Sequence, residues 1–316
     1  MKQILLMIAV VAVVGCGQND LGPAAEIEQA SSDTGSADIV SSSETDVAQI
    51  KSEPTPAEKA AAENAAKKAA AIKKMADKAQ AKAFTNTLGM KFVPVSETKV
   101  AFCIWETRVK DYAAYAAANA EVDASWKYFN GADAGGFKQA DTHPVMNVSW
   151  NDAQAFCAWL TKKELAEGKI KPGQKYRLPT DAEWSVAVGL GKEVGDTPEA
   201  KDGGIKDVYP WRKEWPPAVG AGNYYKSLKV DNFEYTSPVG SFAANKLDLH
   251  DMGGNVWEWC EDWYGPAAKA LRVLRGASWY GNDPDPLLSS YRFNFTPGYR
   301  GNVIGFRCVL VGGSGG

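Results

Sequence analysis

The chain has 316 residues, a formal net charge of −3 and 45% hydrophobic residues, which is enough apolar material for one large domain with appendages. A charge this close to neutral gives no electrostatic signature of nucleic-acid binding, so no nucleic-acid partner is expected. The chain has two histidines, His143 and His250, and no C-x-x-C pair, which argues against a zinc site and against Ser-His catalysis.

The first fifteen residues have the form of an export signal. One lysine precedes an apolar run from Ile4 to Val14, which is too short to span a bilayer. The sequence V-V-G-C at 13–16 resembles a lipoprotein processing box, so we predict that residues 1–15 are a signal peptide and that Cys16 is lipid-modified. An exported protein without a lipid is the alternative. Because Gly17 rather than Asp follows Cys16, a Gram-negative host would favour the outer membrane.

Two segments between Cys16 and the folded domain are predicted to act as a tether to the membrane. Residues 16–55 are rich in Ser, Thr, Asp and Ala and nearly free of aromatics, which predicts a disordered linker. Residues 56–83 are almost all Ala, Lys, Glu and Gln, which predicts a helix capped by Thr55. This helix lacks an apolar stripe, so a solvated spacer is favoured over a coiled coil. The folded domain then covers 84–311, and 312–316 form a flexible tail.

The first half of the domain carries strand and helix patterns. Asn86–Pro94 and Val100–Trp105 are predicted strands, and Thr107 is the predicted cap of a helix to Asn119. In that helix Tyr112 and Tyr115 fall on one side.

Two capped helices are predicted next. Ser149 caps a helix whose apolar stripe has helical spacing and consists of Ala153, Phe156, Cys157 and Leu160. Thr180 and Glu183 form a capping box for a third helix that ends near Leu190. Asp152 and Glu183 are acids in a first helical turn, where they serve the cap and the helix dipole rather than catalysis. From Gly191 onward no helical period is present.

The stretch Leu249–Trp263 combines a Gly-Gly turn with three tryptophans. In an extended backbone Trp257 and Trp259 point to one face and Glu258 to the other, which predicts a core strand entered through a tight turn. Oxygen-bearing residues lie around the same turn, and such groups around a kinked backbone suit a hard cation such as Ca²⁺.

Several motifs occur in an order that resembles one family. They are H-P-V-M-N-V-S-W at 143–150, R-L-P-T-D-A-E-W at 177–184, G-G-N-V-W-E-W at 253–259, R-V-L-R-G-A-S-W at 272–279 and G-F-R-C at 305–308. Together they resemble the formylglycine-generating enzyme (sulfatase-modifying factor) family over roughly residues 84–311. The resemblance implies an irregular α+β fold related to C-type lectins, with little regular secondary structure.

The resemblance also implies two structural calcium sites. One would use the side chains of Asn223 and Asp231 with the carbonyls of Tyr224 and Phe233. The other would use the side chains of Asp251 and Glu258 with the carbonyls of Gly254 and Val256. Ligation by oxygen alone suits calcium. The alternative is that Asp231 and Asp251 are ordinary turn residues.

The catalytic centre of the family has no counterpart in this sequence. The family oxidises a substrate cysteine to formylglycine with a copper ion held by two cysteines, and Gly281 stands where the first is expected. The second would lie near 284–286, and no cysteine occurs between Glu261 and Arg307. Because Cu(I) needs thiolate or thioether ligands, no copper and no formylglycine chemistry are expected.

The segment Trp279–Asn302, which the family fold places at the substrate groove, is rich in Tyr, Phe, Gly, Asn, Asp and Ser, as in antibody binding sites. We therefore predict a non-catalytic module that binds an extracellular or periplasmic ligand, with a protein or peptide favoured. The alternatives are an aromatic face that is simply core, and a formylglycine-generating-type oxidase or an enzyme of altered chemistry on the same fold. The arrangement also resembles the variable proteins of diversity-generating retroelements. The predicted surface consists of Trp279, Tyr280, Asn282, Asp283, Tyr291, Phe293, Asn294, Phe295 and Tyr299.

The resemblance finally implies a disulfide between Cys157 and Cys308. In the family a bridge joins the helix that matches 149–160 to the cysteine of G-F-R-C, and both positions are cysteine here. An oxidising compartment favours the bridge over two buried free thiols. Cys103 and Cys260 are left unpaired.

Overall fold

The computed structural model describes residues 63, 67, 83–129, 137, 139–212, 214–266 and 269–312. The predicted signal peptide 1–15, the lipid site Cys16, the linker 16–55, most of the helix 56–83 and residues 313–316 of the tail lie outside these ranges. Glu63 and Lys67 are described as helical and form an ion pair of 2.8 Å one helical turn apart. Among the described helices, none combines the length and the apolar character that a bilayer crossing needs.

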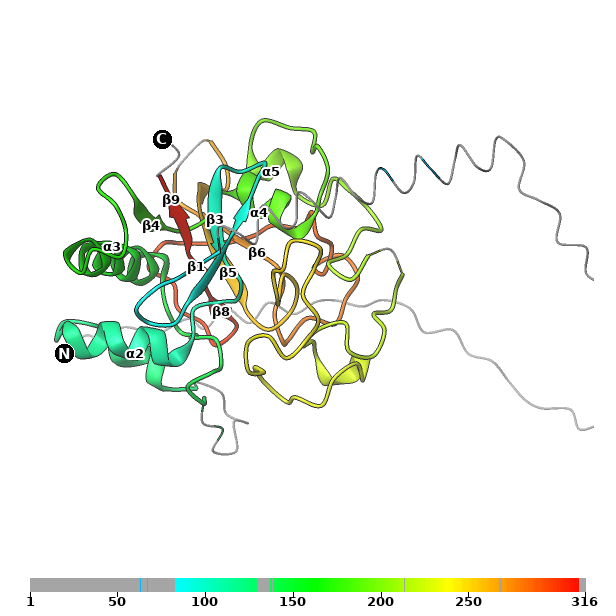
Figure 1. Ribbon diagram of the computed structural model, residues 1–316. Coiled ribbons are helices and arrows are strands. Elements are labelled where there is room, and N and C mark those ends of the chain that lie inside the picture. Colours follow the sequence, from blue (N-terminus) through cyan, green and yellow to red (C-terminus); the bar gives the residue numbers. More distant parts are fainter. Residues whose placement is uncertain are drawn as a thin grey trace, which may run out of the picture. The chain divides into compact units, whose positions relative to one another are not determined.

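A five-stranded antiparallel sheet joins the two ends of the domain. β9 (Val309–Val311) pairs with β3 (Val100–Cys103) and with β4 (Lys175–Arg177), so this strand lies inside the sheet rather than at its edge (Figure 1). The strand order is β1-β2-β3-β9-β4, formed by Phe84–Thr85, Lys91–Val95, Val100–Cys103, Val309–Val311 and Lys175–Arg177.

A second sheet of four strands carries the tryptophan-rich stretch. β5 (Trp257–Trp263) pairs with β6 (Arg272–Arg275) in antiparallel fashion and with β8 (Ile304–Gly305) in parallel fashion. β7 (Phe293–Phe295) forms the outer edge next to β6. Every residue from Trp257 to Cys260 is buried, as the predicted core strand requires.

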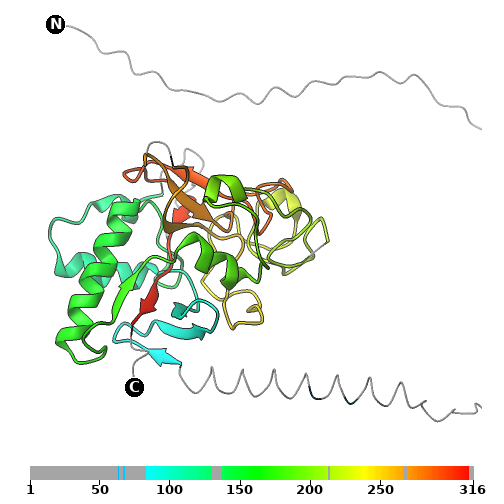
Figure 2. The same cartoon turned by 90° about the horizontal axis from the view of Figure 1, so that it is seen from above.

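Helices cover the strands at two places. α2 (Val109–Ala118) and α3 (Trp150–Ala166) lie together at one side of the molecule, in Figure 1 and again from above in Figure 2. Tyr112 of α2 stacks on Phe156 of α3 with ring centroids 5.8 Å apart. The remaining helices are α4 (Asp181–Val188), α5 (Pro198–Lys201), and the 3-10 turns Ala124–Lys127 and Lys226–Leu228.

The local cap signals are confirmed. Ser149 and Thr180 accept hydrogen bonds from the backbone N–H groups of Asp152 and Glu183, and each acid reaches back to its cap residue. The apolar stripe of α3 from Ala153 to Leu160 is buried. Glu183 also binds the Arg177 guanidinium through two contacts of 2.7 Å, so its role is structural, as predicted.

Two predictions at the start of the domain need correction. The strand expected from Asn86 begins only at Lys91, because the Asn86 side chain accepts the N–H groups of Leu88 and Met90 and closes a turn with Gly89 at a φ of +72°. The next helix is capped at Arg108 rather than Thr107, since the Asp111 carboxylate accepts the backbone N–H of Arg108 at 3.0 Å.

The second half of the domain is irregular, as predicted. Between α5 and β5 the described residues contain one 3-10 turn and no strand of two or more residues.

In the first half of the domain, the strand predicted to run from Val100 to Trp105 is shorter than expected, because it ends at Cys103.

Candidate functional site

The turn before β5 is held by the side chain of Asn255. Its backbone has a φ of +59°, a left-handed conformation that asparagine tolerates better than most residues. Its Oδ1 accepts the N–H of Ser237 at 3.0 Å and the Nδ2 of Asn223 at 3.2 Å, and its own Nδ2 donates to Glu106 at 2.8 Å. One buried amide thus joins four segments that lie far apart in the sequence.

Glu258 is the partner of a buried arginine. Arg307 donates to its two carboxylate oxygens from Nε and Nη2 at distances between 2.6 and 3.0 Å, and the Trp184 indole N–H donates to Oε2 at 3.0 Å. All three residues are buried. Arg307 also donates to the carbonyls of Cys103 and His250. The negative charge that the second predicted calcium site would use is therefore already balanced by a guanidinium.

Glu106 is a buried acid beside this pair that the sequence did not single out. Burial raises its pKa well above the usual value, and the neighbouring carboxyls of Asp251 and Glu258 raise it further. Burial likewise raises the pKa of Asp251, whose Oδ2 accepts the N–H of Gly240 at 2.6 Å. An acid between β3 and α2 that does not cap the helix is the sequence signal that could have found Glu106.

The first predicted calcium set has one feature that fits a cation. Asn223 Oδ1 is buried and has no hydrogen-bond partner within the described residues. The Asp231 carboxylate lies in the same loop and accepts the N–H groups of Tyr224 and Phe233 at 3.0 and 2.8 Å. An amide carbonyl oxygen that accepts no hydrogen bond and a carboxylate in the same loop are both groups that calcium takes as ligands.

The second predicted set fits less well. Its carboxylates are Asp251, which is engaged by Gly240, and Glu258, which is engaged by Arg307. Gly254 and Val256 are buried at the turn, where Val256 donates its N–H to Glu106 at 3.4 Å. In the ranges that the structure describes, no cluster of three or more His, Cys, Asp or Glu side chains is arranged to hold a metal. Any calcium here would depend largely on backbone carbonyls.

We expect excess chelator to lower the melting temperature by on the order of 5 °C, with recovery on adding calcium, because a ligand of the native state stabilises it by mass action. The Asp231→Asn variant should lose most of the calcium-dependent increment, whereas Asp196→Asn, which changes an exposed acid outside both sets, should keep it. Melting curves with and without EDTA measure the effect. Identical melting curves, together with no metal detected by elemental analysis, would refute the predicted calcium sites.

Four rings of the predicted binding segment are linked through Trp257 and one another, and they are here called the aromatic row: Tyr291, Phe293, Phe295 and Tyr299. Phe293 packs between Trp257 and Phe295 with centroids 5.5 and 5.0 Å away, and Phe295 stacks on Tyr299 at 3.8 Å. Tyr291 lies 6.0 Å from Trp257 at the other end. Tyr291, Phe293 and Phe295 are half-buried and Tyr299 is 41% exposed, so the row is partly accessible to a ligand.

The remaining predicted surface residues differ in exposure. Tyr280 is 60% exposed and packs edge-on against Tyr225 at 5.0 Å, and Asn282 and Asp283 are exposed beside it. Asn294 is half-buried in β7. Trp279 is buried, and its indole N–H donates to the Asn302 carbonyl at 3.1 Å, so it supports the surface from below rather than forming part of it.

A buried charge network fixes the segment that precedes the aromatic row. Arg275 and Arg292 both contact the Asp181 carboxylate of α4, and Arg292 also binds Glu193 with contacts of 2.6 and 2.7 Å. Burial alone would raise the pKa of Asp181, but the two guanidinium groups hold it below its usual value. Arg275 further donates to the Ser289 carbonyl at 2.8 Å. The segment is therefore anchored by ion pairs rather than by regular structure.

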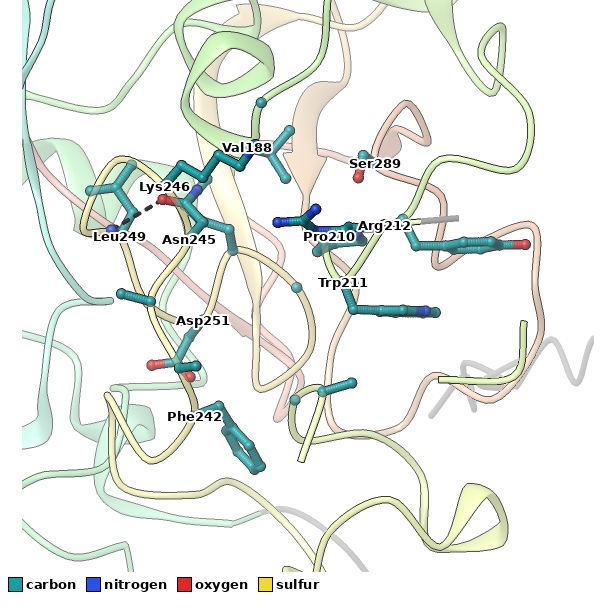
Figure 3. Close-up of a pocket in the computed structure, with 18 of the residues that line it drawn as sticks. Val188, Pro210, Trp211, Arg212, Phe242, Asn245, Lys246, Leu249, Asp251 and Ser289 are labelled. Atoms are coloured by element: carbon teal, nitrogen blue, oxygen red, sulfur yellow. Dashed lines mark hydrogen bonds between the residues drawn. The ribbon is translucent and has the colours of Figure 1, made fainter. Parts of the chain in front are cut away.

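A pocket of about 690 Å³ lies away from the aromatic row. Its walls come from segments 208–212, 220–222 and 242–253, with contributions from the end of α4 and from Ser289 (Figure 3). Of the predicted binding and metal residues, only Asp251 lines it. Sequence reasoning missed this pocket because its walls are irregular loops without periodicity.

Comparisons with known proteins agree with the resemblance. The model of the "Sulfatase-modifying factor enzyme 1-like domain" matches residues 53–311, and so begins ahead of residue 84, where we placed the start of the folded domain. An "Inactive C-alpha-formylglycine-generating enzyme 2" of Mus musculus is 36% identical over 180 residues, which cover 54% of this chain and 50% of that protein. A "Formylglycine-generating enzyme" of Streptomyces coelicolor is 33% identical over 186 residues, covering 53% and 52%. The chain thus spans about half the length of the curated relatives it matches.

The fold is also similar to that of a solved structure. PvdO from Pseudomonas aeruginosa superposes with a TM-score of 0.53 at 23% identity, covering 73% of this chain and 98% of that one. At this identity the likeness concerns the fold alone.

Proposed function

This chain belongs to the family of the Sulfatase-modifying factor enzyme 1-like domain, and we propose that it is a non-catalytic member that binds a protein or peptide ligand. The observation that carries the proposal is the partly exposed aromatic row of Tyr291, Phe293, Phe295 and Tyr299. Rigid aromatic side chains provide large contact area at low entropic cost, and they commonly contribute most of the energy of an interface. The absence of cysteine between Glu261 and Arg307 is consistent with a role that needs no copper.

The proposal also includes a location for the protein in the cell envelope. The signal-like residues 1–15 and Cys16 support export and a lipid anchor, and the residues up to the domain would hold it away from the membrane. The diversity-generating retroelement hypothesis stays a prediction. A near-copy of the DNA for 272–307, rich in asparagine codons and next to a reverse transcriptase gene, would support it.

Selection of random peptides displayed on phage tests the binding proposal. We expect the full chain to enrich a consensus peptide, and the Phe295→Ala, Tyr299→Ala double variant to lose about tenfold or more in affinity for it, since truncating a central aromatic commonly costs about 2 kcal/mol. The control is Leu165→Ala, which removes an exposed apolar side chain of α3 and should leave binding unchanged. Enrichment that is equal on the double variant would contradict the proposal.

We also expect no copper-dependent oxidation of a sulfatase-type cysteine peptide. The positions that match the copper-binding cysteines of the family hold Gly281 and the residues near 284–286, which cannot bind Cu(I) through a thiolate. Incubation of the purified chain with peptide, copper and oxygen, followed by mass spectrometry, measures the reaction. Formation of the aldehyde product above a protein-free control would favour the alternative of an enzyme.

A further inference from the structure

The pocket lined by segments 208–212, 220–222 and 242–253 has the size of a small-molecule site. Its volume of about 690 Å³ lies within the range of about 300–1,000 Å³ that is typical of such sites. Its lining includes the buried residues Leu249, Met252 and Gly253, together with Val188 and Gly189 at the end of α4. It does not include the aromatic row, so it is a separate feature of the domain.

Aromatic rings form one side of the pocket. Tyr209 and Trp211 stack with ring centroids 4.7 Å apart and planes 8° from parallel, and both line the pocket. Phe242 contributes a further ring from the opposite loop (Figure 3). Trp211 and Phe242 are only half-buried, which leaves ring surface available to a flat apolar group.

The polar groups of the pocket favour an anion. Arg212 and Lys246 are exposed lining residues, and the side chain of neither forms a hydrogen bond or an ion pair with any residue that the structure describes. The Arg212 guanidinium points into the pocket in Figure 3. Asp251 is the single acid of the lining, and the Gly240 N–H engages one of its oxygens. The lining therefore carries two cations whose side chains are unpaired among the described residues, against one buried carboxylate.

Ser289 and Arg212 each have a feature that is unfavourable in the unliganded domain, and ligand binding would compensate for it. Ser289 is only 3% exposed and lines the pocket, yet its hydroxyl has no partner among the described residues, and a buried polar group without a partner is unfavourable. Arg212 has a backbone φ of +114°, held by reciprocal hydrogen bonds with Tyr209. Strained backbone of this kind is concentrated at binding sites. Both features lie in the pocket that the two cations border.

We propose that this pocket binds a small aromatic carboxylate. Its carboxylate would meet the Arg212 guanidinium, whose planar fork of N–H donors matches a carboxylate, with Lys246 adding attraction. Its ring would lie against Trp211, and an acceptor atom would take the hydrogen bond of Ser289. The site goes beyond the proposed function, because peptide binding at the aromatic row uses none of these three contacts.

Titration calorimetry of the full chain with indole-3-acetate tests the proposal. We expect saturable binding of indole-3-acetate. The neutral analogue indole-3-acetamide should bind at least about tenfold more weakly, because a charge-assisted hydrogen bond is lost. Arg212→Gln should weaken the binding of indole-3-acetate by a similar factor without changing the binding of indole-3-acetamide. Lys162→Gln, which removes an exposed charge of α3, is the matched control and should bind as the unchanged chain does.

A second variant separates a binding role from a structural one. Ser289→Ala removes a hydroxyl that has no partner, so we expect weaker binding of indole-3-acetate with a melting temperature that is equal or higher. Equal affinity for acid and amide, unchanged affinity in Arg212→Gln, or no saturable binding would overturn the proposal. Binding that is lost in Tyr299→Ala but kept in Arg212→Gln would assign the ligand to the aromatic row and would also overturn it. Tight binding of inorganic phosphate without binding of indole-3-acetate would overturn the aromatic part.

Discussion

Reduction should lower the free energy of unfolding by up to about 5 kcal/mol, because we predict that the exported protein carries a Cys157–Cys308 disulfide whose loop restricts the unfolded chain. The two sulfur atoms lie 3.6 Å apart, and the residues are 151 positions apart in the sequence. Cys157 lies on the buried face of α3, and Cys308 directly precedes β9. Both thiols are free in the structure, yet they are in contact, so oxidation requires only a small approach of the two side chains.

Urea unfolding of the oxidised chain with and without reductant measures the effect. The Cys157→Ala variant should lose the dependence on reductant, whereas Cys260→Ala should keep it, since Cys260 is buried and its sulfur contacts the Glu258 carbonyl rather than either of these two sulfur atoms. Cys103 is the competing partner, because its N–H donates to the Cys308 carbonyl at 2.9 Å. Peptide mapping identifies the bridge. Complete alkylation of all four thiols in the oxidised protein would show that no bridge forms.

Local signals in the sequence predicted the helices of this domain well. The caps of α3 and α4 depend on residues three apart, Ser149 with Asp152 and Thr180 with Glu183, so they can be read from a short window. The turn at Asn86 is equally local, but its apolar flanks suggested a strand. Side-chain hydrogen bonds to the backbone outweighed that preference.

Contacts between distant segments were beyond the reach of sequence patterns. Arg307 and Glu258 are 49 positions apart, and no periodicity indicates that the arginine would take the carboxylate assigned to a cation. The pocket could not be predicted for the same reason, because Arg212, Lys246 and Ser289 come from three loops that only the tertiary fold brings together. The family resemblance located the aromatic row, but it could not indicate that Trp279, which we also assigned to the binding surface, would be buried.

The Asp181→Ala variant should be destabilised by about 3–5 kcal/mol, because removing one partner of a buried ion pair leaves charge without compensation. Arg275 and Arg292 are both fully buried and share the Asp181 carboxylate, so the variant leaves Arg292 with Glu193 and leaves Arg275 without a carboxylate contact among the described residues. Arg275 also holds the Ser289 carbonyl at 2.8 Å. We therefore expect the segment 281–292 to loosen before the rest of the domain unfolds.

Urea unfolding at neutral pH measures the loss, and hydrogen exchange locates it. The control Glu234→Ala breaks the exposed pair with Lys226 and should change stability by less than about 1 kcal/mol. Since the folded-state pKa of Asp181 is held below its usual value, its contribution is present above the unfolded pKa of about 3.9 and is lost as the pH falls through the lower folded value. The difference between the original chain and Asp181→Ala should therefore shrink only in strong acid. A variant as stable as the control at neutral pH would mean that α4 does not anchor this segment through its buried charge.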